Sequence, residues 1–255
     1  IRVGQSDVFL TEACEYTNSF LAFHPLYSII LNVEEDHMDF FKDIDDIKHS
    51  FHIFASQTAP DGQIIINGDM EHTGDIVKGL SQKVITFGMG AENDYTAKDI
   101  SYDREGNGSY TLVVRGEELG HISLKVKGAH NVMNSLAAIA CSRAIGLSME
   151  QITSGLLAFS GTHRRFEIKG NIGDVIVIDD YAHHPTEIQA TLNAAREYPH
   201  DELWVVFQPH TYSRTKAFLP KFAEVLSQAD HVILADIFAA REPDTGIVSS
   251  MDIVN

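Results

Sequence analysis

The segment DDYAHHPTE, residues 179–187, holds the densest group of chemically active side chains in this 255-residue sequence. Two aspartates, a tyrosine and two histidines precede a proline, so a metal site is the first interpretation. Adjacent histidines point to opposite sides of an extended chain, however, and no cysteine or well-spaced third ligand lies nearby in the sequence. We therefore expect one of His183 and His184 to face a ligand and the other to pack against or cap a helix that begins at Pro185.

Two acidic segments follow the first two apolar runs of the chain. Ligands of parallel α/β sheets gather at the carboxyl ends of strands, so acids that directly follow such runs are in position to bind them. Mg²⁺ takes one or two protein oxygen ligands and leaves its other positions to water and phosphate. The alternative is that these acids only stabilise helix N-termini. The side chains concerned are Glu12 and Glu15 in TEACEY and Glu34, Glu35, Asp36, His37 and Asp39 in NVEEDHMD.

Three further segments carry amides or cations. In KGAHNVMNS, Asn131 and Asn134 lie one helical turn apart, so their amides could bind a nucleotide base or ribose; N-capping by Asn131 is the alternative. In THRRFE, Arg164 and Arg165 lie where an arginine could reach a phosphate as two domains close, unless the pair is only solvated. The third segment, FQPHTYSRTKAF, could receive a phosphate or carboxylate through His210, Tyr212, Arg214 and Lys216.

The composition limits the partners that this chain could have. Asp and Glu number 36 against 19 Lys and Arg, and the formal charge of −17 argues against nucleic acid as a ligand. The apolar runs are too short to span a membrane and the N-terminus lacks a signal-peptide layout, so we expect a cytoplasmic protein without membrane insertion. Cys14 and Cys141 fit no metal spacing, and we interpret both as buried thiols.

The elements that position these segments alternate between strands and helices. Asp43 is a candidate N-cap for an amphipathic helix over residues 43–57, and Ser148 for another over 148–159. Turn signals between residues 94 and 127 predict antiparallel hairpins, and an Ala-rich stretch predicts a helix over 131–146. A second α/β series starts at Phe166, so we predict domains at 1–162 and 163–255. Strands are expected at 7–13, 27–33, 63–68, 83–88, 175–181, 203–209 and 231–237, and helices after Pro185 and over 216–229.

Six segments, taken together and in order, resemble the Mur ligase family of peptidoglycan synthesis. They are TEACEYTNSF, NVEEDHMDFF, GAHNVMNSLAA, FSGTHRRFE, DDYAHHPTE and FQPHTYSRT, and they extend over nearly the whole chain. The resemblance implies an α/β fold: a central P-loop ATPase domain with a mostly parallel sheet plus antiparallel hairpins, then a Rossmann-like C-terminal domain. Within the family, DYAHHPTE and FQPHTYSRT point to the member that adds L-alanine to UDP-N-acetylmuramate.

The resemblance also implies a reaction. ATP phosphorylates the lactyl carboxylate of UDP-N-acetylmuramate, and the amine of L-alanine attacks the resulting acyl phosphate. By resemblance, Glu12 and His37 would bind Mg²⁺, and together with Arg165 and His183 they would be catalytic. The ATP-binding residues would be Asn131, Asn134, Arg165, Asp180 and Tyr181. The residues that face the muramyl carboxylate and the alanine would be His183, His210 and Arg214.

The sequence departs from the family pattern in its extent. It contains no G-x-x-x-x-G-K-[ST] phosphate loop, and by resemblance it begins after that loop and after the UDP-binding domain. It also stops before a complete C-terminal domain, so we expect both domains to be incomplete and this chain alone to be inactive. Lys48 is out of register with the carbamoylated lysine of related ligases, and the modification is not predicted.

Three alternatives to the L-alanine ligase stay open from the sequence. One is the recycling ligase that joins a murein tripeptide to the same muramyl nucleotide. Another is a non-catalytic binding module of the same fold, against which the retained Glu12, His37 and Arg165 argue. The last is an unrelated two-domain α/β protein with surface acids and capping asparagines. The sequence leaves the oligomeric state open.

Overall fold

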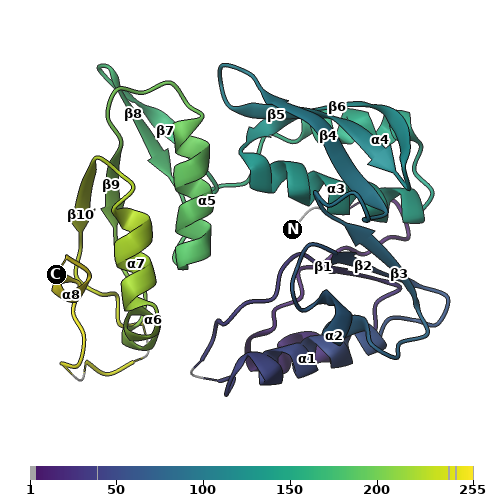
Figure 1. The fold of residues 1–255 in the computed structure, drawn as a ribbon, viewed down its shortest axis with the longest axis horizontal. Coiled ribbons are helices and arrows are strands. Elements are labelled where there is room, and N and C mark those ends of the chain that lie inside the picture. The colour runs from purple at the N-terminus through teal and green to yellow at the C-terminus, as the bar shows by residue number, and fades with distance from the viewer. Residues whose placement is uncertain (1–3, 39, 241, 245, 255) are drawn as a thin grey trace.

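The chain forms two α/β parts that lie side by side (Figure 1). The structure is a computed structural model and describes residues 4–38, 40–240, 242–244 and 246–254; Asp39, one of the acids considered above, lies outside these residues. The N-terminal part extends through α4 and surrounds a six-stranded sheet, and the C-terminal part begins at β7 and contains two small sheets. The α/β class predicted from the sequence is confirmed.

The central sheet has the strand order β1-β2-β3-β4-β5-β6. Its first four strands run parallel, β1 Tyr27–Ile30, β2 Gln63–Asn67, β3 Lys83–Phe87 and β4 Tyr95–Tyr102. The remaining strands, β5 Asn107–Val114 and β6 Glu117–Lys127, are joined to β4 and to each other as antiparallel neighbours. The sheet therefore combines a parallel half, whose carboxyl ends could face a ligand, with the hairpins predicted over residues 94–127.

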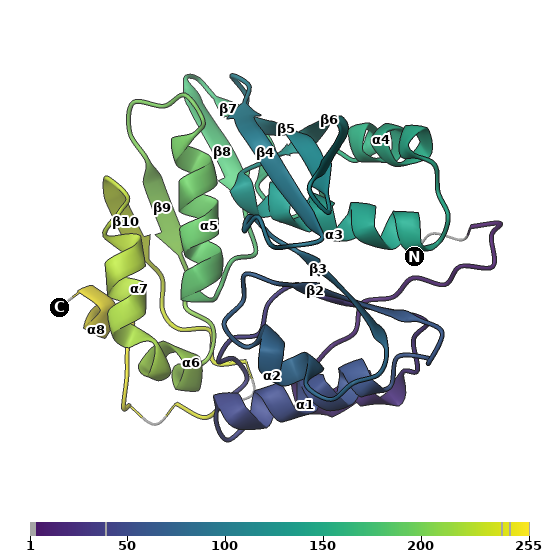
Figure 2. The same cartoon turned by 45° about the vertical axis from the view of Figure 1, so that its right-hand side comes forward.

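Helices cover both faces of the parallel strands, and β2 shows this most clearly (Figure 2). Its Ile64 and Ile66 pack into a core with α1 Ile44–Ser56 and α2 Thr73–Val77 on one face. On the other face, Ile65 packs into a core with α3 Ala129–Ala144 and α4 Met149–Ala158. Burial on both faces explains why these strands read as continuous apolar runs rather than as alternating patterns.

Two helix starts occur where the sequence predicts them. The Asp43 carboxylate accepts a hydrogen bond from the backbone N–H of Asp46 at 2.9 Å and caps α1. Ser148 caps α4 through a reciprocal capping box with Gln151. A side-chain cap satisfies backbone donors that the first turn of a helix leaves without partners, which is why these short polar residues mark the starts.

The C-terminal part is built around the amphipathic helices α5 Pro185–Arg196 and α7 Leu219–Leu226. Strands β9 Trp204–Phe207 and β10 His231–Leu234 pair in parallel, and the short helices α6 Tyr212–Ala217 and α8 Met251–Val254 complete this part. The single helix predicted over 216–229 is wrong at its start: α6 ends at Ala217 and α7 begins at Leu219, with a proline in its first turn. Strand β8 Val175–Asp179 pairs with β7 Glu167–Ile172, a strand that the sequence did not predict.

Two further predictions, a strand near the N-terminus and the burial of both cysteines, are wrong. Residues 7–13 form no strand, because a strand requires a hydrogen-bonding neighbour and none of the described strands pairs with this segment. The apolar side chains Phe9 and Leu10 of this segment are 85% and 81% exposed. Cys14 is exposed rather than buried, and Cys141 is only partly buried.

The two parts approach each other closely at the start of α3. Gly128 precedes this helix with φ of 84°, a conformation that L side chains rarely adopt. A Cβ atom at this position would lie 3.0 Å from the Cβ atom of Ala194 in α5. Glycine is therefore required here both by the backbone conformation and by the close approach of α5.

Candidate active site between the two α/β parts

The acidic segment of residues 32–37 directly follows β1 and contacts the C-terminal part. Oδ1 of Asp36 accepts hydrogen bonds from Nη2 and Nε of Arg214 at 2.7 and 3.2 Å, and from the backbone N–H of His37 at 2.7 Å. Burial of the Asp36 carboxyl disfavours its charge, but the bonds and charge of Arg214 outweigh this effect and hold the pKa of Asp36 below its ordinary value. Asp36 is therefore a stable carboxylate that faces the second α/β part.

His37 forms an ion pair with a glutamate from another segment. Its Nε2 lies 3.2 Å from Oε1 of Glu15, and its ring centroid lies 4.7 Å from that of Tyr16. The hydrogen bond to Glu15 raises the pKa of His37, and the same bond lowers the pKa of Glu15. His37 also has φ of 53°, an unusual backbone conformation for a non-glycine residue that is found preferentially at functional sites.

The N-terminus of α5 lies against the same acidic segment. The Thr186 hydroxyl donates to Oε2 of Glu34 at 2.6 Å, and Nδ1 of His184 lies 3.8 Å from the same oxygen. His184 caps α5 by accepting from the backbone N–H of Thr186, and Pro185 is the first residue of the helix. The prediction that one of the two histidines caps this helix is confirmed, and the capping residue is His184.

The arginines between the two parts surround Tyr181. The guanidinium carbons of Arg164 and Arg165 lie 4.7 and 5.9 Å from the Tyr181 ring centroid, distances typical of cation–π contacts. Nη1 of Arg165 is 3.7 Å from Oε1 of Glu187, and the Arg165 side chain is 54% exposed. Among the described residues, the Arg165 side chain makes a long ion pair and a stacking contact, and its 54% exposure leaves its charge accessible to a ligand. Arg164 lies 3.8 Å from Asp179.

The Asp180 carboxylate binds backbone N–H groups of two other residues. Its two carboxylate oxygens accept from the backbone N–H groups of Phe166 at 2.7 Å and Ala182 at 2.8 Å. These bonds join the start of β7 to the end of β8. A ligand ribose would have to share oxygens that are already engaged, which weakens the sequence-based expectation for Asp180.

The first turn of α3 brings the predicted nucleotide-binding amides close to this group. Nδ2 of Asn131 donates to the Lys127 carbonyl at 2.8 Å, while Asn134 is exposed. Burial lowers the pKa of the neighbouring His130, with an opposing influence from Asp180 and a reinforcing one from Arg165. The charges of Asp180 and Arg165, which belong to the other part, thus act on His130. The start of α3 and the arginine pair therefore border one region.

The substrate-binding residues predicted from the resemblance also meet. The ring centroids of His183 and His210 are 6.0 Å apart, and Nη1 of Arg214 lies 3.4 Å from Nδ1 of His210. Nδ1 of His183 contacts the Tyr181 carbonyl at 2.9 Å. His183 from the loop before α5, His210 from the segment before α6 and Arg214 from α6 thus form a polar group next to the Asp36 carboxylate.

One predicted residue does not join the site. Glu12 lies in the exposed N-terminal segment, and none of the contacts found in the described part of the chain joins it to His37. Glu15 occupies the position expected of Glu12. Both acids were visible in TEACEY, but only the fold decides which of them turns toward His37. The interdomain roles of Glu34, Asp36 and Thr186 were also missed, and the one signal for them was their position directly after a strand or at a helix start.

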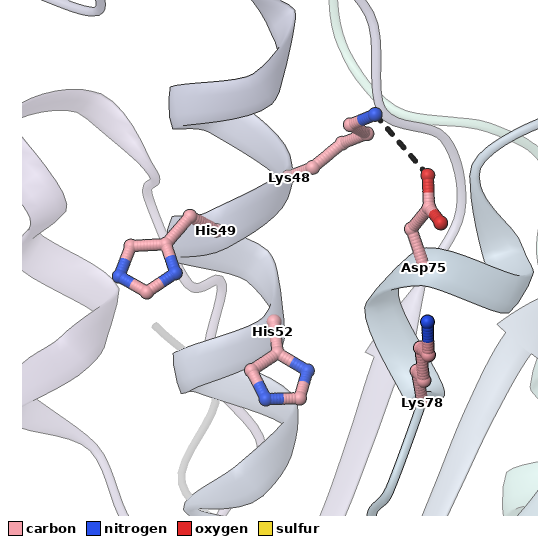
Figure 3. A pocket seen from close by; sticks show the side chains of 5 residues that line it. All are labelled: Lys48, His49, His52, Asp75 and Lys78. Atoms are coloured by element: carbon pink, nitrogen blue, oxygen red, sulfur yellow. Dashed lines mark hydrogen bonds and ion pairs between the residues drawn. The ribbon is translucent and has the colours of Figure 1, made fainter.

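A hollow lies away from this site, lined by side chains of α1 and α2 (Figure 3). Its volume is about 330 Å³, and Lys48, His49, His52, Asp75 and Lys78 line it. Lys48 forms ion pairs with Asp45 at 2.7 Å and with Asp75 at 3.1 Å. None of the predicted site residues lines this hollow, so we do not assign the site to it.

Two features are absent from the described residues. Among them, no cluster of three or more His, Cys, Asp or Glu side chains has an arrangement suited to a metal ion. No helix in the described part of the chain combines the length and the apolar character needed to cross a membrane.

Two family models match the chain and define its class. The Mur ligase middle domain matches residues 3–142, and the Mur ligase glutamate ligase domain matches residues 164–253. The chain belongs to the Mur ligase family.

The named relatives indicate the branch of the family. Over all 255 residues the chain is 56% identical to a UDP-N-acetylmuramate–L-alanine ligase of Agathobacter rectalis, and it spans 56% of that relative's length. The crystal structure of the UDP-N-acetylmuramate–alanine ligase MurC of Thermotoga maritima is similar at 31% identity and a TM-score of 0.70, with 87% of this chain and 48% of that one covered. A murein peptide ligase of Psychrobacter arcticus is 28% identical with a TM-score of 0.62, covering 85% and 44%. The chain thus spans about half the length of the relatives that it matches.

Proposed function

We propose that this chain belongs to an ATP-dependent ligase that joins L-alanine to UDP-N-acetylmuramate, and that it contributes residues of the ligase active site. The observation that carries the proposal is the 56% identity over the whole chain to a ligase with that name. The contact between Asp36 and Arg214 supports it, because a two-substrate ligase needs groups from both domains at one site. The proposed domains are residues 1–162 and 163–255, and the proposed location is the cytoplasm.

The proposed reaction has two steps. An oxygen of the lactyl carboxylate attacks the γ-phosphorus of ATP, the bond to the β-phosphate oxygen breaks, and ADP and an acyl phosphate result. The amine of L-alanine then attacks the acyl carbon, loses a proton and expels inorganic phosphate as the amide forms. Positioning and charge neutralisation account for most of the catalysis of such phosphoryl transfers.

The side chains of this chain divide into two groups in the proposed reaction. Asn131, Asn134 and Tyr181 border the region that we assign to the nucleotide, and Arg165 is the accessible cation that would approach its phosphates. Asp180 supports the position of Tyr181 through its backbone bonds. His183, His210 and Arg214 would hold the muramyl carboxylate and the alanine.

Glu15 and His37 could hold a Mg²⁺ ion that has few protein ligands once the proton between them is lost. Nε2 of His37 and Oε1 of Glu15 lie 3.2 Å apart as an ion pair, and His37 would bind a metal only as the neutral ring with a free nitrogen. Mg²⁺ often uses only one or two protein ligands beside water and phosphate. We propose Glu15, in place of Glu12, as the partner of His37 at this site. When bound, the ion would neutralise phosphoryl charge.

Phosphate release by the full-length protein tests this function. Release should require ATP, UDP-N-acetylmuramate and L-alanine together, and a murein tripeptide in place of L-alanine should be a much poorer substrate. The whole-chain identity of 56% to a relative that is named as the L-alanine ligase favours this order. A preference for the tripeptide would support the recycling ligase instead, and a folded protein without release for either substrate would support the binding module.

A further inference from the structure

A second hollow lies at the opposite end of the central sheet from the candidate active site. Its volume is about 250 Å³, and it lies between the last turn of α3 and the sheet. Gln63 and Lys83, the paired first residues of β2 and β3, line it together with Arg115, Arg143 and Tyr95. The acidic segment follows the last residue of the parallel strand β1, so the length of the sheet separates the two regions.

The charges around this hollow contrast with those of the whole chain. Lys83, Arg115 and Arg143 enter it from three elements, namely β3, the β5–β6 turn and α3, and none of the described lining residues is an acid. The chain as a whole carries a formal charge of −17, so three cations around one hollow run against its overall composition. Asp94 binds Nε of Arg115 at 2.8 Å and thereby neutralises one of the three charges in part.

Arg143 provides the second observation. Its Nη1 atom is buried and has no hydrogen-bond partner among the described residues, while its guanidinium carbon lies 5.8 Å from the Tyr95 ring centroid. Buried polar atoms normally have partners, and a charged donor without one is costly. A cation in the last turn of a helix is favourable for the helix dipole, but that effect leaves the hydrogen-bonding capacity of Nη1 unused.

We propose that this hollow binds a small phosphate-type oxyanion. Three cationic groups that approach from different elements suit the several oxygens of a tetrahedral anion better than the two oxygens of a planar carboxylate. The volume is below the roughly 300–1,000 Å³ of pockets for drug-sized ligands, so the anion is small. The site is separate from the proposed active site, because Asn131 and Arg143 lie at opposite ends of α3, about 18 Å apart at the rise of an α-helix.

Calorimetric titration of the full-length protein with inorganic phosphate, without nucleotide, tests the proposal. Saturable binding should weaken at least about tenfold in Arg143→Gln, because a charge-assisted donor is lost, and to a smaller extent in Lys83→Gln. Arg104→Gln removes the same charge from an exposed position outside the hollow and should leave the affinity unchanged. The side-chain NMR signal of Arg143 should shift on addition of phosphate.

Three results would overturn the assignment. The first is the absence of saturable phosphate binding by the unchanged protein. The second is a phosphate affinity in Arg143→Gln and Lys83→Gln that equals that of the unchanged protein. The third is tighter binding of malonate than of phosphate. Thermal unfolding of each variant checks its fold. If Arg143→Gln is unstable, Lys83→Gln alone decides the outcome, because Lys83 is exposed and its replacement leaves the core intact.

Discussion

Arg214 binds Asp36 across the boundary between the two α/β parts. The two residues are 178 positions apart in sequence, yet Nη2 and Nε of Arg214 lie 2.7 and 3.2 Å from one carboxylate oxygen. The Arg214 side chain is only 10% exposed. A charge that is this well buried depends on its partner, so this contact ties the proposed substrate-binding loop to the segment that follows β1.

Replacement of Asp36 by Asn should weaken the contact between the two parts and lower the stability of the protein. The neutral amide leaves Arg214 largely buried without its counter-charge, so we expect the free energy of unfolding to fall by about 1–3 kcal/mol. Denaturant unfolding measures this loss. The matched control is Glu118→Gln, which breaks the exposed Lys98–Glu118 pair and should cost less than about 0.5 kcal/mol. A double-mutant cycle with Arg214→Gln should show coupling, and additive effects of the two changes would contradict a direct interaction.

The fold could be predicted where local patterns and packing agree. Asp43 and Ser148 carry helix caps that depend on a few neighbouring residues, so the sequence alone identifies them. Residues 7–13 have the same apolar character as β1 but form no strand, because strand formation depends on a neighbour that a linear pattern does not reveal. Strand β7 was missed for the opposite reason: its pairing with β8 stabilises a segment with a weak pattern of its own.

The candidate site could be predicted only to the level of segments. Each of the segments that were named for their chemistry contributes to the candidate site, and in TEACEY the contributing residue is Glu15 rather than Glu12. The choice between Glu12 and Glu15 depends on the turn that leads into the short helix at residues 16–22 and on the unusual backbone of His37. Such details arise from tertiary contacts, so spacing and residue type cannot supply them.

The proposed metal site distinguishes Glu15 from Glu12. Glu15→Gln removes the carboxylate beside His37, so the Mg²⁺ concentration that gives half-maximal ligase activity should rise at least about tenfold. Glu12→Gln is the matched control and should change this concentration little, because Glu12 is exposed and the carboxylate that contacts His37 is that of Glu15. Steady-state phosphate release by the full-length variants over a range of Mg²⁺ concentrations measures both. The reverse order of the two effects would restore the assignment to Glu12.

Tyr110 should make stability depend on alkaline pH. Its hydroxyl lies 2.6 Å from the Ser135 hydroxyl, and burial raises the pKa of Tyr110 to about 12 from an ordinary 10.0. The folded protein thus keeps the neutral phenol while the unfolded chain ionises, so stability is intact below pH 10 and declines as the pH rises through about 12. Tyr110→Phe should reduce this decline and cost about 1 kcal/mol near neutral pH. The raised pKa values of Tyr102, Tyr212 and Cys141 act in both proteins, so their contribution cancels from the difference. Tyrosinate absorbance and denaturant unfolding measure the two effects; an unchanged alkaline decline in Tyr110→Phe would refute the assignment.

His184 should make stability depend on mildly acidic pH. Its ring is buried and lies 4.7 Å from that of Phe218, and its Nδ1 accepts from the backbone N–H of Thr186. Burial lowers the pKa of His184 below the ordinary 6.5, although the carboxylates that face it act in the opposite direction. These carboxylates belong to Glu34, Asp36 and Glu187.

The lowered pKa fixes the sign of this dependence. Below pH 6.5 the unfolded chain takes up the proton before the folded protein does, so the free energy of unfolding falls as the pH drops from 6.5 through the folded pKa of His184. Asn is also a good N-cap and does not titrate, so His184→Asn should show a shallower acidic decline than the unchanged protein while stability at about pH 8 is largely kept. His184→Ala, which loses the cap, should lose about 1 kcal/mol at both ends of this range. Denaturant unfolding at a series of pH values separates the variants.

His130 provides an internal control for this comparison. Burial also lowers the pKa of His130, but this residue is present in all the variants, so its titration cancels from the difference. An acidic decline of equal slope in His184→Asn would show that His184 does not titrate with folding.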